Sequence, residues 1–121
     1  MISPEVIRGY IDLIVLESLL DEPSYGYAIS RRVESLTAGE YEIKETTLYS
    51  ALRRLEKSDF VSSYKAKAET GRIRTYYELT ATGREHYANR VAEWVSTGAL
   101  VRRFIRDEHL ASVGTTPKST Q

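Results

Sequence analysis

Cysteine is absent from this sequence, which also holds a single tryptophan and only two histidines, His86 and His109. Without cysteine, neither disulfide bonds nor thiolate metal sites can form. The two histidines stand apart from other metal-ligating residues, and the sequence has no P-loop and no dinucleotide-binding fingerprint. We therefore expect a protein that is not an enzyme and that needs no metal or cofactor.

Long apolar runs are also missing. No run reaches the roughly 20 residues that a membrane helix needs, and no leader with a charged start and an apolar centre opens the chain. With 41% hydrophobic and 28% charged residues among 121, the composition is that of one ordinary globular domain. The expectation is a cytoplasmic protein without membrane contact.

Positive charge is scarce at the start of the chain. Residues 1–30 hold one basic residue, Arg8, against five acidic ones, whereas residues 31–74 hold ten against seven. Residues 75–121 hold six against five, so the formal net charge of the chain is zero. A basic middle segment is the pattern that a nucleic-acid-binding protein needs, because only the contacting face must be positive.

Apolar periodicity, together with turn and cap signals, predicts an ordered series of elements. They are a helix over 5–20, a helix over 25–37 capped by Ser24, a short strand over 41–43, a helix from about 45 to 58, a hairpin with strands over 60–67 and 72–79, and a helix over 81–107 capped by Thr80. From residue 111 the composition predicts a disordered tail to 121. The order predicts a mainly α fold with a small β-wing: a winged helix-turn-helix DNA-binding domain over 5–80 and a long C-terminal dimerisation helix over 81–107.

The helix that begins near residue 45 has two contrasting faces. Its apolar face, within about a 100° arc, predicts packing on the core; it consists of Leu48, Ala51, Leu52 and Leu55. The opposite face carries short hydroxyl side chains and long cations, the mixture expected of a helix that lies against phosphates and base edges.

In a helix-turn-helix protein the N-terminal turns of the second motif helix enter the major groove. Either Arg53 or Arg54 could read a guanine there, whereas Lys57 is better placed for the backbone. Tyr25 and Tyr27 are more often core residues than contacts, although Tyr25 can reach a phosphate. The predicted DNA contacts, which include four cations around the hairpin tip, are Tyr25, Thr46, Thr47, Tyr49, Ser50, Arg53, Arg54, Lys57, Lys65, Lys67, Arg72 and Arg74.

The predicted last helix carries side chains spaced 4-3-4-3-4, which is the seam of a paired helix. A chain of 121 residues offers no obvious second helix to meet that seam, so a second copy of the chain is expected as partner. The predicted dimer interface consists of Tyr87, Val91, Trp94, Gly98, Val101 and Ile105.

Several segments also resemble a known family. "YGYAI" at 25–29, "TTLYSALRRLEKSDFV" at 46–61 and "GRIRTYYELTATGREHY" at 71–87, with Trp94, are similar to the PadR family of transcriptional regulators, most closely to its short subfamily with one C-terminal helix. That subfamily includes multidrug-sensing repressors. The resemblance implies a homodimeric repressor bound to a pseudo-palindromic DNA operator.

The resemblance also implies a small-molecule site at the dimer interface. Gly98, one turn after Trp94, leaves a gap beside the indole, and related regulators bind planar aromatic compounds between paired tryptophans. A carboxylate at Glu17 would attract a cationic effector, or would instead form an ion pair with an arginine of the last helix. The implied ligand-binding residues are Val6, Tyr10, Leu13, Glu17, Val91, Trp94 and Gly98.

Two other functions remain open from the sequence. The winged helix could bind a protein partner through the same surface, or it could bind DNA without any effector, in which case Trp94 would only be structural.

Overall fold

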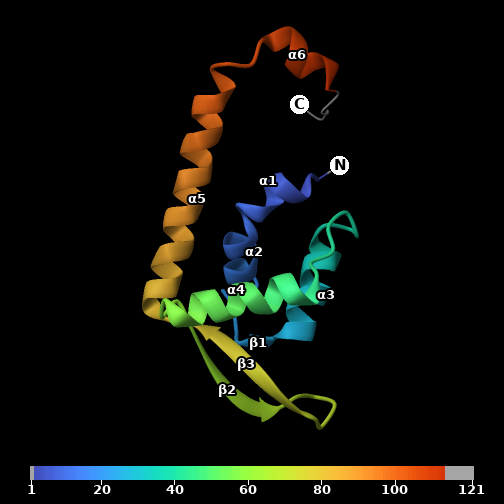
Figure 1. Cartoon of the computed structure of the whole chain (residues 1–121), viewed down its shortest axis with the longest axis vertical. Helices are drawn as coiled ribbons and strands as arrows, with labels where there is room; N and C mark the ends of the chain where they lie inside the picture. Colours follow the sequence, from blue (N-terminus) through green and yellow to red (C-terminus); the bar gives the residue numbers. More distant parts are fainter. Residues whose placement is uncertain (1, 114–121) are drawn as a thin grey trace. The chain divides into compact units, whose positions relative to one another are not determined.

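The computed structural model describes residues 2–113 (Figure 1). The chain divides into two compact units, residues 1–89 and residues 90–121, and each is described here by itself. Within the described residues, none of the helices is both long enough and apolar enough to cross a membrane.

The N-terminal helix is broken. The helix expected over 5–20 consists of α1 (Pro4–Arg8) and α2 (Ile11–Glu17), so that prediction of one continuous helix was wrong. The break falls at Gly9, which lowers helix propensity by about 1 kcal/mol relative to alanine, and at Tyr10, whose φ of −115° is not helical. After Glu17, turns replace the last expected helical residues.

The first unit is completed by α3 (Gly26–Leu36), α4 (Glu45–Lys57) and the start of α5 (Ala81–Arg102). Tyr25 is the N-cap residue of α3 and offers no side-chain bond, so the cap expected from Ser24 was wrong. The expected core face of α4 is confirmed, because its four apolar residues are all buried. They pack with Val15 and Leu16 of α2 and with Ile29 of α3 in one cluster.

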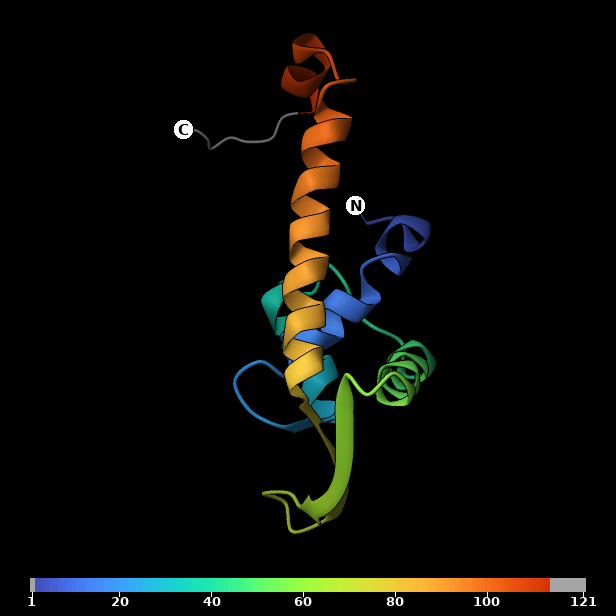
Figure 2. The ribbon, with the colours of Figure 1, turned by 90° about the vertical axis from the view of Figure 1, so that its left-hand side faces the viewer.

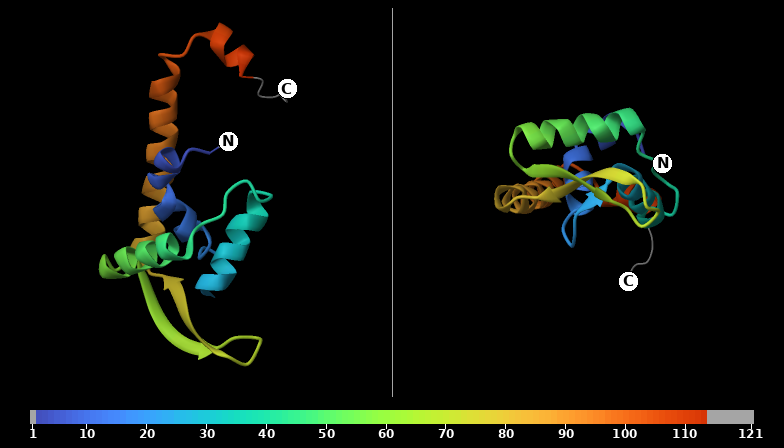
Figure 3. Two further views of the ribbon diagram at one scale, coloured as in Figure 1. Left: turned by 45° about the vertical axis from the view of Figure 1, so that its right-hand side comes forward. Right: turned by 90° about the horizontal axis from the view of Figure 1, so that it is seen from below.

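A three-stranded antiparallel sheet has the order β1-β3-β2, with β1 (Ser24–Tyr25), β2 (Val61–Lys67) and β3 (Ile73–Leu79). The expected hairpin is confirmed, with Val61 opposite Leu79 and Lys67 opposite Ile73. Figure 3 shows this hairpin extending away from α2, α3 and α4.

The strand expected over 41–43 does not form. Thr37 Oγ1 accepts a hydrogen bond from the backbone N–H of Tyr41 and donates one to its carbonyl oxygen, at 3.1 and 3.2 Å. A side chain therefore satisfies the backbone groups that a neighbouring strand would have bonded, and the third strand comes from Ser24–Tyr25 instead.

The end of α4 is bonded to the start of α5. Asp59 ends α4 with a φ of 65°, a left-handed conformation that asparagine and aspartate tolerate better than most residues. Its carbonyl oxygen accepts hydrogen bonds from Thr80 Oγ1 at 2.6 Å and Thr82 Oγ1 at 3.0 Å. Thr80 Oγ1 in turn accepts the N–H of Gly83 at 3.0 Å, so the expected Thr80 cap is confirmed.

The last helix is shorter than expected. Instead of reaching residue 107, α5 ends at Arg102, and a separate helix, α6, spans Asp107–Ser112. Backbone N–H groups from 103 to 105 bond to carbonyls three residues earlier, which tightens and stops the helix. The acidic pair Asp107 and Glu108 then favours a new N-terminus. The tail expected from 111 starts inside α6, and 114–121 lie outside the described residues.

Candidate nucleic-acid interface

The polar face of α4 is open to solvent. Thr46, Ser50, Arg53 and Lys57 are all exposed, as is Arg54 on one flank, while Thr47 and Tyr49 are half-buried. In Figure 2, α4 is seen almost along its axis, with β2 beside it. The hairpin is joined to α4 by a hydrogen bond of 2.6 Å from Ser63 Oγ to Glu56 Oε2. Helix and hairpin therefore form one continuous polar surface.

The two adjacent arginines of α4 have different surroundings. One amino nitrogen of Arg54 donates to Asp12 Oδ1 of α2 at 2.5 Å. Arg53 forms no hydrogen bond or ion pair with the residues that the structure describes. Of the two, Arg53 is the one whose guanidinium donors are all unpaired among the described residues.

A shallow hollow of about 280 Å³ lies beside the first turns of α4. It brings together four predicted DNA contacts with two residues that the prediction omitted, the apolar Ile11 and the cation Arg8 of α1. Arg8 is the single cation of residues 1–30, and that isolation was the signal that could have singled it out. The hollow is lined by Arg8, Ile11, Thr46, Thr47, Ser50 and Arg54.

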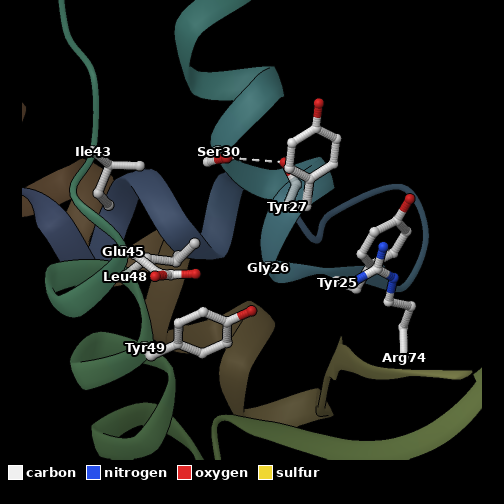
Figure 4. A pocket seen from close by; sticks show the side chains of 9 residues that line it. All are labelled: Tyr25, Gly26, Tyr27, Ser30, Ile43, Glu45, Leu48, Tyr49 and Arg74. Atoms are coloured by element: carbon white, nitrogen blue, oxygen red, sulfur yellow. Dashed lines mark hydrogen bonds between the residues drawn. The ribbon is translucent and has the colours of Figure 1, made fainter.

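A second hollow, of about 330 Å³, lies between α3, α4 and the sheet (Figure 4). It brings together three predicted contacts that come from separate segments, Tyr25, Tyr49 and Arg74. The guanidinium of Arg74 lies 5.5 Å from the ring centroid of Tyr25, a cation–π distance. Its Nε is buried without a hydrogen-bond partner among the described residues.

Tyr27 also lines this second hollow, and 57% of its surface is exposed. The expectation that it belongs to the core was therefore wrong. Its hydroxyl accepts a hydrogen bond from Arg31 at 2.9 Å, which holds the ring against α3 rather than in the interior.

The four predicted cations of the hairpin do not all lie on one face of it. Lys65 and Lys67 share one face of β2 because side chains alternate along a strand, while Arg74 lies opposite Ala66 and belongs to the other face. Arg72, Lys65 and Lys67 are exposed. Beside them Ile73 is 63% exposed, an apolar side chain that the prediction did not include.

The predicted dimer residues beyond 90 are largely uncovered within their unit. Trp94 is 54% exposed, Val101 and Ile105 are also exposed, and a Cβ added at Gly98 would meet nothing within 4 Å. Ile105 lies after the end of α5 rather than in it. Tyr87 differs from the others because it packs against the core of the first unit.

The implied ligand residues of the first unit do not gather in one place. Val6 is exposed, whereas Leu13 and Glu17 line an apolar hollow of about 220 Å³ with Val33 and Tyr41. Glu17 is already paired: its two carboxylate oxygens accept from Nε and an amino nitrogen of Arg32, at 3.1 and 2.5 Å.

That pairing corrects the expected bridge from Glu17 to an arginine of the last helix. The partner is in α3, and Glu17 also raises the pKa of Arg32, through its hydrogen bond first and its charge second. Among residues 2–113, no group of histidine and carboxylate side chains is arranged to hold a metal ion.

Helices α3 and α4, followed by the β2–β3 hairpin, define the winged helix-turn-helix class of DNA-binding transcriptional regulators. Residues 15–89 match the family described as "Transcriptional regulator PadR-like family". The chain belongs to this family of transcriptional regulators.

Individual relatives agree with that assignment. A transcriptional regulator from Clostridium thermocellum is 44% identical, with a TM-score of 0.79 over 88% of this chain and 100% of its own. A PadR family transcription regulator from Clostridium difficile is 31% identical, with a TM-score of 0.68 over 79% and 98%. An uncharacterised protein from Lysinibacillus sphaericus is 33% identical over 87% of this chain and 96% of its own.

Proposed function

We propose that this regulator is a homodimeric repressor that binds a pseudo-palindromic DNA operator. The observation that carries the proposal is the exposed face of α4 with its hydroxyl groups and cations, joined through the Ser63–Glu56 hydrogen bond to a hairpin that carries further exposed cations toward its tip. The N-terminal half of α4 would enter the major groove, and Lys65, Lys67 and Arg72 would contact the flanking backbone.

Dimerisation is supported by the apolar surface of the second unit. Trp94, Val95, Leu100 and Val101 are each at least half exposed within it, and monomeric proteins rarely leave so many large apolar side chains of one helix in water. Two α4 helices related by a two-fold axis would meet successive major grooves about 34–36 Å apart.

A small-molecule effector is the second part of the proposal. An exposed indole at Trp94, with open space around Gly98 four residues later, supports stacking of a planar aromatic or cationic compound at the dimer interface. Such a compound would relieve repression only by binding the DNA-free state more tightly than the DNA-bound state.

Selection of bound fragments from a random DNA pool tests the central claim. We expect enrichment of an inverted repeat whose half-sites are separated by one helical turn. Affinity for the selected site should fall linearly on a log–log plot against salt, with a slope set by the number of phosphates contacted. Binding that is insensitive to salt, with no enriched sequence, would favour a winged helix that binds a protein partner.

The fluorescence of Trp94 tests the effector separately, because it is the only tryptophan. A planar cation stacked on the indole should quench the emission, and Gly98→Leu should abolish that quenching by filling the gap. If no compound from a panel of planar aromatic cations quenches the Trp94 fluorescence of the wild-type protein, the regulator works without an effector site at Trp94.

A further inference from the structure

We infer that Arg8 and Arg54 together hold one phosphate group of the operator backbone, whereas Arg53 is the arginine that reads a base. The inference rests on the proposed function and assigns separate roles within its site. It adds Arg8, which lies outside the helix-turn-helix, to the residues that bind DNA.

The hollow beside α4 has the chemistry of a phosphate site. Two arginines, Arg8 of α1 and Arg54 of α4, line it together with three hydroxyl-bearing residues and one apolar residue: Thr46, Thr47, Ser50 and Ile11. Proteins commonly bind phosphate oxygens through charge-assisted hydrogen bonds from arginine, supplemented by hydroxyl donors. The volume of about 280 Å³ accommodates one phosphate group with bound water.

Arg8 supplies the net charge of this hollow. The charge of Arg54 is offset by Asp12, whose carboxylate accepts its hydrogen bond at 2.5 Å. Arg8 has no ion pair among the residues that the structure describes. Without Arg8 the hollow would therefore be nearly neutral, and an anion would gain little by entering it.

Asp12 also determines where Arg54 lies. Its carboxylate accepts from one amino nitrogen of Arg54 and holds the side chain toward α2, among the residues that line the hollow, while the other guanidinium donors remain available. A phosphate accepts single hydrogen bonds from several directions, so a tethered guanidinium still binds it. Asp12 is thus a positioning residue that turns Arg54 toward the hollow.

Arg53 meets the opposite requirement. It is exposed on the polar face of α4 and pairs with none of the described residues, so two parallel donors of its guanidinium can meet a base edge. Arg54, the next residue in the sequence, is bonded to Asp12 of α2 instead. The different surroundings give the two arginines different roles.

Four alanine variants test the assignment: Arg8→Ala, Arg54→Ala, Arg53→Ala and Arg103→Ala. The last is a charge-matched control, because Arg103 follows α5 in the second unit. Affinity is measured against salt for the selected operator and for operators with each base pair replaced. Arg8→Ala and Arg54→Ala should weaken binding to every operator by the same factor and reduce the salt slope by about 1 each.

Arg53→Ala should behave differently. It should cost roughly 5- to 150-fold on the selected operator and nearly nothing on the operator that lacks its base pair. Arg103→Ala should match the wild type. Arg8→Lys should recover the slope that Arg8→Ala loses, which separates a charge effect from a defect in folding.

An unchanged salt slope in Arg8→Ala overturns the phosphate site, and a changed base preference in Arg54→Ala overturns the division of roles. If Arg54→Ala leaves both the operator affinity and the salt slope unchanged, Arg54 serves only the ion pair with Asp12. Failure of the proposed function looks different, because the wild-type protein itself would then bind no sequence in a salt-dependent way.

Discussion

The ring of Tyr49 covers Gly26, so that a Cβ atom added to this glycine would lie only 2.5 Å from Cζ of the tyrosine (Figure 4). The missing side chain lets the first turn of α3 approach α4 closely, and it places the Tyr49 hydroxyl at the edge of the hollow that Tyr25 and Arg74 also line. Two segments of the helix-turn-helix thus meet through a glycine and an aromatic ring.

Gly26→Ala should therefore destabilise the protein by about 1–3 kcal/mol, the usual cost of overpacking. Part of that cost should disappear when the ring is removed. In urea unfolding, the double variant with Tyr49→Ala should lose less stability than the sum of the two single variants. Simple additivity would show that the two side-chain positions do not compete for space.

Gly83→Ala should be more damaging, because the added Cβ would lie 2.9 Å from the carbonyl carbon of Phe60, and backbone atoms cannot move aside as a side chain can. We expect a loss above about 3 kcal/mol, beyond ordinary overpacking. Gly9→Ala is the matched control: its nearest neighbour would be Val6 O at 3.7 Å, and its φ of −69° suits alanine. Thermal unfolding should show Gly9→Ala at least as stable as the wild type.

Stability should fall at alkaline pH because of one buried and one partly buried phenol. Burial raises the pKa of Tyr77 and of Tyr41 above 10.0 in the folded protein. The unfolded chain then loses these protons first, so the contribution of these two tyrosines to stability is constant below about pH 10 and falls as the pH rises further. Tyr77→Phe with Tyr41→Phe should flatten this part of the curve of unfolding free energy against pH. An unchanged slope would assign the alkaline sensitivity to other groups.

Val101→Glu should disrupt the dimer, since a carboxylate buried without a partner in an apolar interface is costly. Sedimentation equilibrium should find this variant monomeric at micromolar concentration, with weaker binding to a two-site operator. Ser96→Glu adds the same charge to α5 outside the proposed interface and should remain dimeric. A monomeric wild-type protein would remove the interface altogether.

The elements with strong local signals were predictable from the sequence. Leu48, Leu52 and Leu55 follow the helical period closely enough to identify α4 and its buried face, and the turn around Gly71 identifies the hairpin, where its φ of 89° suits a residue without a side chain. The break at Gly9 was harder to predict, because a lone glycine is often tolerated inside a helix.

Long-range pairing was the part that periodicity could not predict. Strand β1 exists only because Ser24 and Tyr25 meet Tyr77 and Tyr76, some fifty residues later. The pairs Arg54–Asp12 and Glu17–Arg32 likewise join residues that are distant in sequence. Which of the two α4 arginines is paired with a carboxylate depended on such a contact.

The hydrogen bonds from Thr80 and Thr82 to the carbonyl oxygen of Asp59 connect the N-terminal end of α5 to the C-terminal end of α4. A rotation of the first turn of α5 would therefore act directly on Asp59, the residue at which the chain leaves α4.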